Sequence, residues 1–183
     1  MFCRQNMNVF LKEIKFSSKI HTYIQDMTKD VEEAVKKSGV INGWALVNSK
    51  HTTLGIIVNE IAEPNLLSDI IEHTLKSVPE DKRSTRITKD YKHQVTDYKH
   101  RCQDNPFYNE VDEDYNSAAH IRALTFSHAS VNVPLRNGKL ELGKYQQIAI
   151  FEHDGRDGKG KNPVRKRTIQ IWIYPFSKVS VLK

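Results

Sequence analysis

Apolar residues in this chain of 183 residues occur only in short runs, and that pattern limits what the chain can fold into. The longest runs, such as residues 44–47 and 148–151, contain four residues, whereas a helix needs about 20 apolar residues to cross a bilayer. We therefore expect no membrane-spanning segment. The start of the chain, MFCRQNMNVF, lacks the apolar stretch of a secretory signal. We accordingly expect a cytoplasmic protein.

The short runs alternate between helical and strand-like periodicity. Ile24, Met27, Val31 and Val35 recur at helical spacing, and Gly39 follows where a glycine commonly ends a helix. The other predicted elements are helices over 64–78 and 117–125 and strands over 9–16, 43–47, 54–58, 130–135, 146–152 and 168–174. The Asn-Gly pair at 137–138 predicts a tight turn. Together these elements predict one compact α+β unit.

Residues 80–116 follow neither period. This segment contains many charges and the scattered aromatic residues Tyr91, Tyr98, Phe107, Tyr108 and Tyr115. Loops of this length are uncommon inside compact domains, and those that exist are often functional or disordered. The aromatic residues favour an ordered segment. We predict a single domain over residues 1–183, with a long inserted loop at about 80–116.

Positive charge is concentrated in one stretch near the C-terminus. The chain has 28 Lys and Arg against 22 Asp and Glu, a formal charge of +6. Residues 156–167, RDGKGKNPVRKR, contain six basic residues and one acid, and so carry +5 of that charge. Their glycines and proline predict an exposed loop between strands. A solvated hairpin tip is the favoured interpretation, and contact with phosphate or nucleic acid is the alternative.

The chain has eight histidines, several of which fall where the chain changes element. His51 follows a predicted strand, His120 follows three small residues, and His93 and His100 lie in two copies of Tyr-Lys-His. Three neutral imidazoles from separate segments can hold zinc and leave one position for water or substrate. Spacing alone favours ordinary surface or core histidines over such a site. Ordinary roles are expected throughout for His21, His73, His128 and His153.

Carboxylates offer a second kind of chemistry. Glu60 at the end of an apolar strand, Asp69 on a predicted helix and Glu152 at the end of another strand are candidates for a general base or for orienting a histidine ligand. A cap, an ion pair or a surface position is the simpler alternative for Glu60 and Asp69. No Gly-x-Gly-x-x-Gly, Walker-type or Gly-x-Ser-x-Gly motif is present. Nucleotide hydrolysis and serine-hydrolase chemistry are therefore disfavoured.

Three motifs together carry a family resemblance. They are HTTLGIIVNE at 51–60, SAAHIRA at 117–123 and SVNVPLRNGKLELGKYQQI at 130–148. With these motifs the chain resembles the YjbQ family, often labelled secondary thiamine-phosphate synthase. The resemblance implies an α+β fold with a mixed β-sheet packed by two main helices, and assembly as a homotrimer. It also implies a pocket near subunit boundaries where three histidines bind a metal.

The resemblance assigns candidate residues to that pocket. His51 and His120 match two of the family's histidines; for the third we prefer His100, which Asp104-Asn105 follows, and keep His93 as its substitute. The implied cofactor is a divalent ion, zinc, or magnesium with a diphosphate substrate. The supporting residues implied by the resemblance are Thr52, Thr53, Asn59, Glu60, Ser130, Gln146 and Glu152.

One departure from the family pattern adds a cation. The usual Gly-Thr-Trp-Gln is replaced by GKYQ at 143–146, so Lys144 joins Arg122 as a candidate for contacting an anionic substrate. We therefore expect a metal-assisted enzyme that acts on a small anionic or phosphorylated molecule, with thiamine-phosphate synthesis as a secondary activity. A non-catalytic metal- or ligand-binding homo-oligomer is the alternative. Nucleic-acid binding through residues 156–167 is disfavoured.

Overall fold

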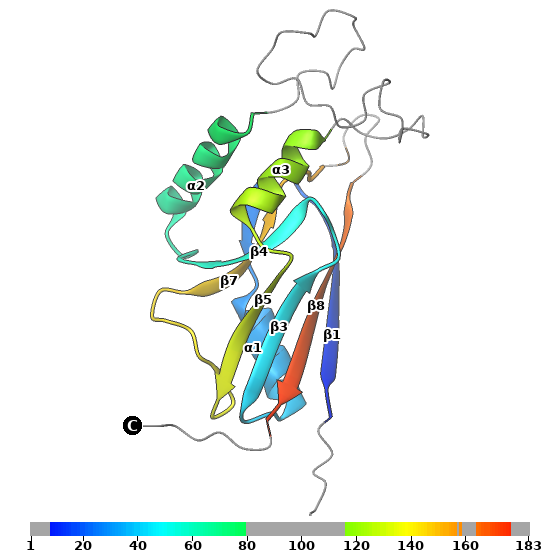
Figure 1. Cartoon of the computed structure of the whole chain (residues 1–183), viewed down its shortest axis with the longest axis vertical. Helices are drawn as coiled ribbons and strands as arrows, with labels where there is room; N and C mark the ends of the chain where they lie inside the picture. Colours follow the sequence, from blue (N-terminus) through cyan, green and yellow to red (C-terminus); the bar gives the residue numbers. More distant parts are fainter. Residues whose placement is uncertain (1–7, 80–115, 157, 159–163, 177–183) are drawn as a thin grey trace, which may run out of the picture.

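The computed structural model describes residues 8–79, 116–156, 158 and 164–176 (Figure 1). The predicted insertion, apart from Asn116, lies outside the described residues, as do His93 and His100. In the part of the chain that is described, no helix has the length and apolar content needed to cross a membrane.

Eight described strands form two antiparallel sheets (Figure 1). The larger sheet has the order β1 (Phe10–Ser17), β8 (Lys166–Pro175), β3 (Gly43–Ser49), β5 (Ser130–Arg136) and β6 (Lys139–Leu140). The smaller sheet has the order β2 (Tyr23–Asp26), β7 (Gln147–Glu152) and β4 (Leu54–Asn59). An isolated bridge from Ile56 to His128 ties β4 to the segment before β5.

Alternate strand residues form the core. In β8, Ile169, Ile171 and Ile173 are buried, whereas the residues between them keep partial exposure. This is the period of two that a half-buried strand requires. Ile56 and Ile150 of the smaller sheet belong to the same buried cluster. Full burial of each such side chain contributes about 1.5–3 kcal/mol to stability.

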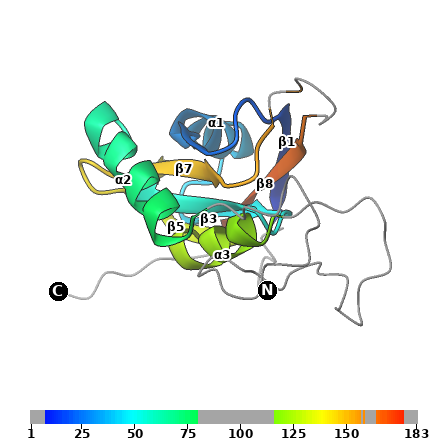
Figure 2. The ribbon, with the colours of Figure 1, turned by 90° about the horizontal axis from the view of Figure 1, so that it is seen from above.

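Helix α1 (Thr28–Ser38) packs on the buried side of the larger sheet (Figure 2). It buries Val31, Ala34 and Val35. The helix ends at Gly39, whose φ of 68° is in the left-handed region that glycine tolerates best. The predicted end of this helix is therefore confirmed.

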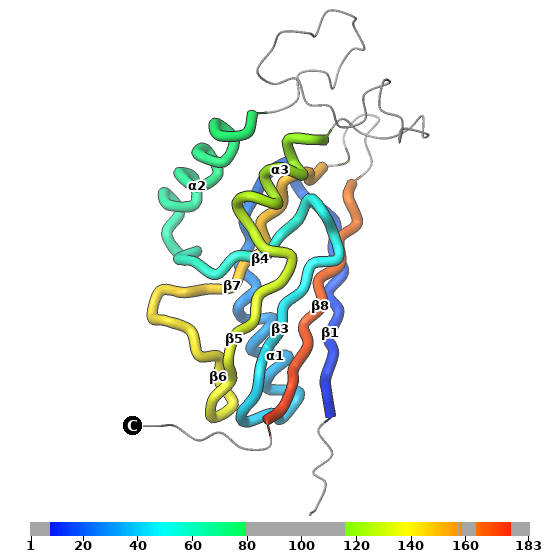
Figure 3. The backbone as a smooth tube through the Cα atoms, in the orientation of Figure 1, coloured from blue at the N-terminus to red at the C-terminus, as the bar shows by residue number. Residues whose placement is uncertain are grey.

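Two further helices lie at the end of the molecule away from α1, the upper end in Figure 1. The carboxylate of Glu63 accepts hydrogen bonds from the N–H groups of Asn65 and Leu66 and so caps α2 (Pro64–Ser77). Helix α3 (Ser117–Phe126) leads into β5, as the trace in Figure 3 shows. The predicted turn at 137–138 joins β5 to β6, with positive φ at Asn137 and Gly138.

The α+β class is confirmed, and three details of the prediction are corrected. The described strands form two antiparallel sheets instead of one mixed sheet. The first helix does not include Ile24, which pairs with Phe151 in β2, because the Asp26 carboxylate accepts from the N–H and hydroxyl of Thr28 and the helix starts there. The strands β7 and β8, which flank the basic stretch, belong to different sheets and therefore do not form the predicted hairpin.

Candidate functional site

Four chain segments meet at one end of the molecule, the upper end in Figure 1: the β3–β4 turn, the start of α3, the end of β7 and the start of β8. Together they line a cavity of about 270 Å³, which we call the histidine pocket. Its lining residues are Lys50, His51, Thr52, Thr53, Asn116, His120, Asp154, Arg165 and Arg167. His51 and His120, 69 positions apart in the sequence, thus lie at one pocket.

The β3–β4 turn fixes His51. The Ser49 hydroxyl donates to Leu54 O over 2.7 Å and accepts from the His51 N–H over 3.2 Å. The imidazole Nε2 accepts a hydrogen bond from the Thr168 N–H at 2.7 Å. A neutral imidazole that accepts at Nε2 carries its proton on Nδ1. Burial, followed by the charges of Arg167 and Lys50, lowers the pKa of His51, which favours this neutral form.

A buried ion pair lies beneath the pocket. Arg167 donates from Nε to Glu152 Oε2 over 2.6 Å and from Nη2 to Oε1 over 2.5 Å. The side chain of Arg167 is 6% exposed and that of Glu152 is 0% exposed. Oε1 also accepts from the N–H groups of His153 and Asp154. Buried charges need such partners to offset their desolvation, so Glu152 is a structural anchor for Arg167.

One nitrogen of Arg167 is left for a ligand. Nη2 also donates to Thr53 Oγ1 over 3.1 Å and lies 3.4 Å from the carbonyl oxygen of Asp154. Nη1 hydrogen-bonds to none of the described residues. It is also not one of the fully buried polar atoms without a partner, so it keeps some accessible surface. Because Arg167 lines the histidine pocket, Nη1 is the donor that Arg167 offers to the pocket.

A second, less buried pair closes the pocket wall. Asp154 Oδ2 accepts from Arg165 Nη2 at 2.5 Å and from Asn116 Nδ2 at 2.7 Å. The pocket and its floor therefore contain three cationic side chains, those of Lys50, Arg165 and Arg167, against the two carboxylates of Asp154 and Glu152. With neutral histidines the difference is 3 − 2 = +1, and both carboxylates are already hydrogen-bonded.

Ser18 joins Arg156 to Arg165, which lines the pocket. Its hydroxyl donates to Arg156 O over 2.7 Å and accepts from the N–H groups of Arg156 and Arg165 over 2.8 and 3.0 Å. Both ends of the 156–165 segment are thereby fixed at a buried serine. Sequence reasoning interpreted Arg165 and Arg167 as part of a solvated loop and missed their place in the pocket. The available signal was that Arg167 is in phase with the buried Ile169, Ile171 and Ile173.

Not all predicted site residues lie here. Thr52 and Thr53 line the pocket, and Glu152 lies beneath it. Asn59 and Glu60 follow at the far end of β4, a strand of six residues, which spans about 20 Å at about 3.3 Å per residue. They are therefore separated from His51 by the length of the strand.

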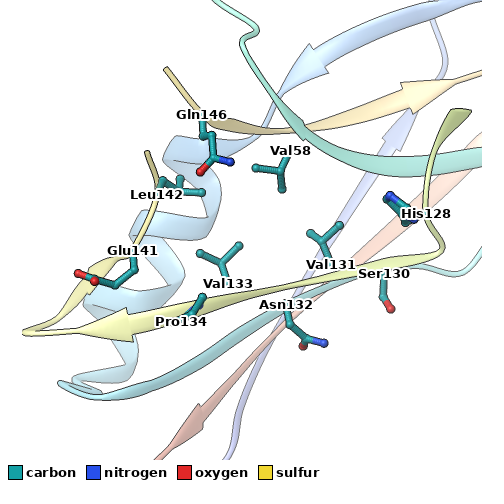
Figure 4. Close-up of a pocket in the computed structure, with 10 residues that line it drawn as sticks. All are labelled: Val58, His128, Ser130, Val131, Asn132, Val133, Pro134, Glu141, Leu142 and Gln146. Carbon is teal, nitrogen blue, oxygen red and sulfur yellow. The ribbon is translucent and has the colours of Figure 1, made fainter. Parts of the chain in front are cut away.

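Ser130 and Gln146 line a different cavity, of about 510 Å³, between β4 and β5 (Figure 4). We call it the valine groove. Figure 4 shows Val58 pointing toward Val131 and Val133, whereas the side chains of Ser130 and Asn132 point away from them. The full lining is Val58, His128, Ser130, Val131, Asn132, Val133, Pro134, Glu141, Leu142 and Gln146.

The two predicted cations line neither cavity. Arg122 is fully buried and donates to the carbonyl oxygens of Val78 and His153, which joins the end of α2 to the end of β7. Lys144 is exposed, with its Nζ 4.9 Å from the ring centre of Tyr145.

The histidines give a partial ligand set. Both His51 and His120 line the pocket, and the third predicted ligand, His100 or His93, lies outside the described residues. The described ranges contain no cluster of three or more His, Cys, Asp or Glu side chains suited to a metal. In its present pose His51 does not fit as a ligand, because Nε2 accepts from Thr168 and Nδ1 carries the proton.

Comparison with known proteins gives the family. The sequence profile of the family described as "UPF0047 protein YjbQ-like" matches residues 12–174. A UPF0047 protein of Methanothermobacter thermautotrophicus is 31% identical over 155 residues, which are 85% of this chain and 90% of that protein. The UPF0047 protein YugU of Bacillus subtilis is 29% identical over 147 residues, 79% of this chain and 90% of YugU.

Solved structures agree with the sequence relatives. A YbjQ-like protein of unknown function from Sulfolobus solfataricus has a TM-score of 0.69 and 29% identity, covering 93% of this chain and 100% of its own. An uncharacterised YjbQ/UPF0047 protein from Clostridium acetobutylicum has a TM-score of 0.63 and 31% identity, covering 88% and 98%. Profile, relatives and structures coincide over most of the sequence, and the chain belongs to the YjbQ/UPF0047 family.

Proposed function

We propose that the histidine pocket binds a small anionic molecule, such as a phosphorylated metabolite, and acts on it. The observation that carries the proposal is Arg167, a buried guanidinium held by Glu152 and Thr53 with Nη1 left over. Lys50 and Arg165 add positive charge at the same cavity. Because charges interact more strongly in a partly buried site than in bulk water, such a pocket favours a negatively charged ligand.

A divalent ion is the second component of the proposal. Zinc, or magnesium with a diphosphate substrate, would bind to His51, His120 and either His100 or His93. Such an ion supplies positive charge that stabilises a departing diphosphate. His51 can join it only after the imidazole releases the Thr168 N–H, because the accepting nitrogen has no second lone pair in the ring plane.

The family resemblance adds a candidate reaction. This reaction joins a pyrimidine diphosphate to a thiazole phosphate and releases pyrophosphate, so both substrates are anionic. We propose this transfer as a secondary activity and a different small phosphorylated molecule as the physiological substrate. Within this proposal Glu152 is a positioning residue for Arg167 instead of a base, since it accepts from Arg167 and two backbone N–H groups.

Pyrophosphate release and bound metal test the two components separately. We expect the full chain, purified without chelator, to release pyrophosphate from the two substrates and to contain zinc by elemental analysis. His51→Ala and His120→Ala should lower both by at least about tenfold, and His128→Ala in the valine groove should lower neither. Retention of stoichiometric metal by both variants would show that the ligand assignment is wrong.

A non-catalytic homo-oligomer is the second candidate, and one surface favours it. The face of the larger sheet opposite α1 has Leu11, Trp172 and Leu46 in one row of strand partners and Tyr174 and Trp44 in the next. Trp44 and Phe176 are each 40% exposed and pack edge to face, with ring centroids 5.5 Å apart.

We propose that this apolar sheet face lies at the contact between subunits of a cytoplasmic homotrimer. Exposed aromatic patches are typical of protein interfaces. Light scattering on the wild type and on Trp44→Ser tests the proposal, with a trimer expected for the first and smaller species for the second. A monomeric wild type at micromolar concentration would contradict it.

A further inference from the structure

We propose that Arg167 and Thr53 form a seat for the phosphate group of a monoester, and that this seat prefers a tetrahedral phosphate to a planar carboxylate. The inference rests on the proposed function, because it names the class of anion that the histidine pocket takes. It requires only the described residues of that pocket and no metal.

The guanidinium of Arg167 is fixed before any ligand arrives. Its Nε and Nη2 edge is bound side-on by Glu152, and Nη2 also donates to the Thr53 hydroxyl. Both residues are almost fully buried, with 6% exposure for Arg167 and 4% for Thr53. A buried, hydrogen-bonded arginine loses little conformational entropy when a ligand binds, which makes it a preorganised donor.

The arginine presents one nitrogen instead of a fork. Recognition of a carboxylate by arginine is strongest when two parallel N–H groups meet its two oxygens. Here Glu152 already occupies such an edge, and Nη1 alone is left for a ligand. A carboxylate therefore gains one strong bond, whereas the divergent oxygens of a phosphate can use Nη1 together with donors from other directions.

Those other donors are present. The Thr53 oxygen accepts from Arg167, so its own proton is left to donate, and no described residue accepts it. His51 lines the same pocket with its proton on Nδ1. Lys50 forms no ion pair with any residue in the described part of the chain and adds a positive charge at the rim.

The polar lining offers Arg167, Thr53 and Lys50 as donors, and among its acceptors Asn116 Oδ1 is buried without a hydrogen-bond partner in the described part of the chain. Asp154 Oδ2 is engaged by Arg165 and Asn116, and Glu152 by Arg167 and backbone N–H groups. A negatively charged group that mainly accepts hydrogen bonds matches these donors. A phosphate monoester supplies three such oxygens on one atom.

Calorimetric titration of the full chain with inorganic phosphate and with acetate, both in the presence of a chelator, tests the inference. We expect phosphate to bind at least about tenfold more tightly than acetate, the equivalent of one charge-assisted hydrogen bond. Thr53→Val and Arg167→Lys should each weaken phosphate binding by about tenfold. The matched controls Thr125→Val and Arg136→Lys, on exposed residues outside the pocket, should stay within about twofold of the wild type.

The outcomes separate the two proposals. Equal affinity for acetate and phosphate, or unchanged phosphate binding in both Thr53→Val and Arg167→Lys, overturns the phosphate seat and leaves the anion pocket standing. If neither phosphate nor acetate binds, the proposed function is overturned as well. Circular dichroism of each variant establishes whether it is folded. If Arg167→Lys is not folded, phosphate binding by Thr53→Val decides whether the phosphate seat exists.

Discussion

The valine groove and the histidine pocket differ in size, and the smaller of them has the buried charges. The valine groove is the larger of the two, at about 510 Å³, and its lining is half apolar and half polar, with every polar side chain exposed. The histidine pocket, at about 270 Å³, has a buried arginine, a buried aspartate and a buried glutamate in its wall and floor. Cavity volume is therefore a poor guide to where buried charges lie.

The difference follows from what each cavity needs in order to be stable. Desolvating Arg167 and Glu152 costs several kcal/mol for each charge, and only a complete set of partners offsets that cost. The valine groove has no comparable desolvation cost, because the ion pair at its edge, Arg136 with Glu141, is largely exposed to water. The proposed ligand, which would use the remaining nitrogen of Arg167, gives a reason for keeping a buried charge pair beside a cavity.

The largest expected effect is the difference in stability lost when each of these two ion pairs is broken. Arg167→Ala leaves Glu152 charged and unpaired inside the protein, so we expect the free energy of unfolding to fall by about 3–5 kcal/mol. Arg136→Ala breaks a pair whose side chains are 52% and 38% exposed and should cost less than about 1 kcal/mol. Urea unfolding measures both. Equal losses in the two variants would remove the distinction between the cavities.

The second effect concerns a buried histidine behind the pocket. Burial, with smaller contributions from the charges of Arg122 and His21, lowers the pKa of His153 to about 3, against about 6.5 in an unfolded chain. Between these pH values the unfolded chain binds more protons, so stability is full above pH 6.5 and is lost as the pH falls. From pH 6.5 to 4.5 the loss from this residue is about 2–3 kcal/mol.

Urea unfolding of His153→Gln at several pH values checks that sign. This variant should show a shallower decline in stability below pH 6.5 than the wild type does. His128→Gln, which changes an exposed histidine of the valine groove, should keep the wild-type decline. A His153→Gln curve parallel to the wild type would mean that His153 does not titrate as its burial requires.

The smallest effect tests how the basic segment is held. Ser18→Ala removes the hydroxyl that joins Arg156 to Arg165, so the position of Arg165 at the pocket becomes less fixed. We expect phosphate affinity to fall about threefold, somewhat less than the value of one neutral hydrogen bond. Ser68→Ala on the exposed side of α2 is the matched control. Unchanged affinity in Ser18→Ala would mean that the segment does not tune the pocket.

Most of the fold could be predicted from local patterns, and the exceptions have tertiary causes. The alternation in 168–174 and the glycine at position 39 predicted β8 and the end of α1, because periodicity and backbone conformation are local properties. Ile24 was assigned to a helix because its spacing to Met27 fits one. Pairing of β2 with β7, which the spacing cannot reveal, decided otherwise.

The candidate site was predicted in part. The motif residues His51, Thr53 and His120 do lie at one pocket, but the same motif also contains Asn59 and Glu60, which β4 carries to its other end. Proximity in sequence is therefore misleading along an extended strand. Arg167 was missed because it stands in a run of basic residues, where charge count obscured its register with the buried isoleucines of β8.

The most direct test of the central claim is a crystal structure of the full chain grown with inorganic phosphate. The account predicts tetrahedral density in the histidine pocket, within hydrogen-bond distance, about 3 Å, of Arg167 Nη1 and the Thr53 hydroxyl. Phosphate bound only in the valine groove or on surface lysines, with water beside Arg167, would contradict it.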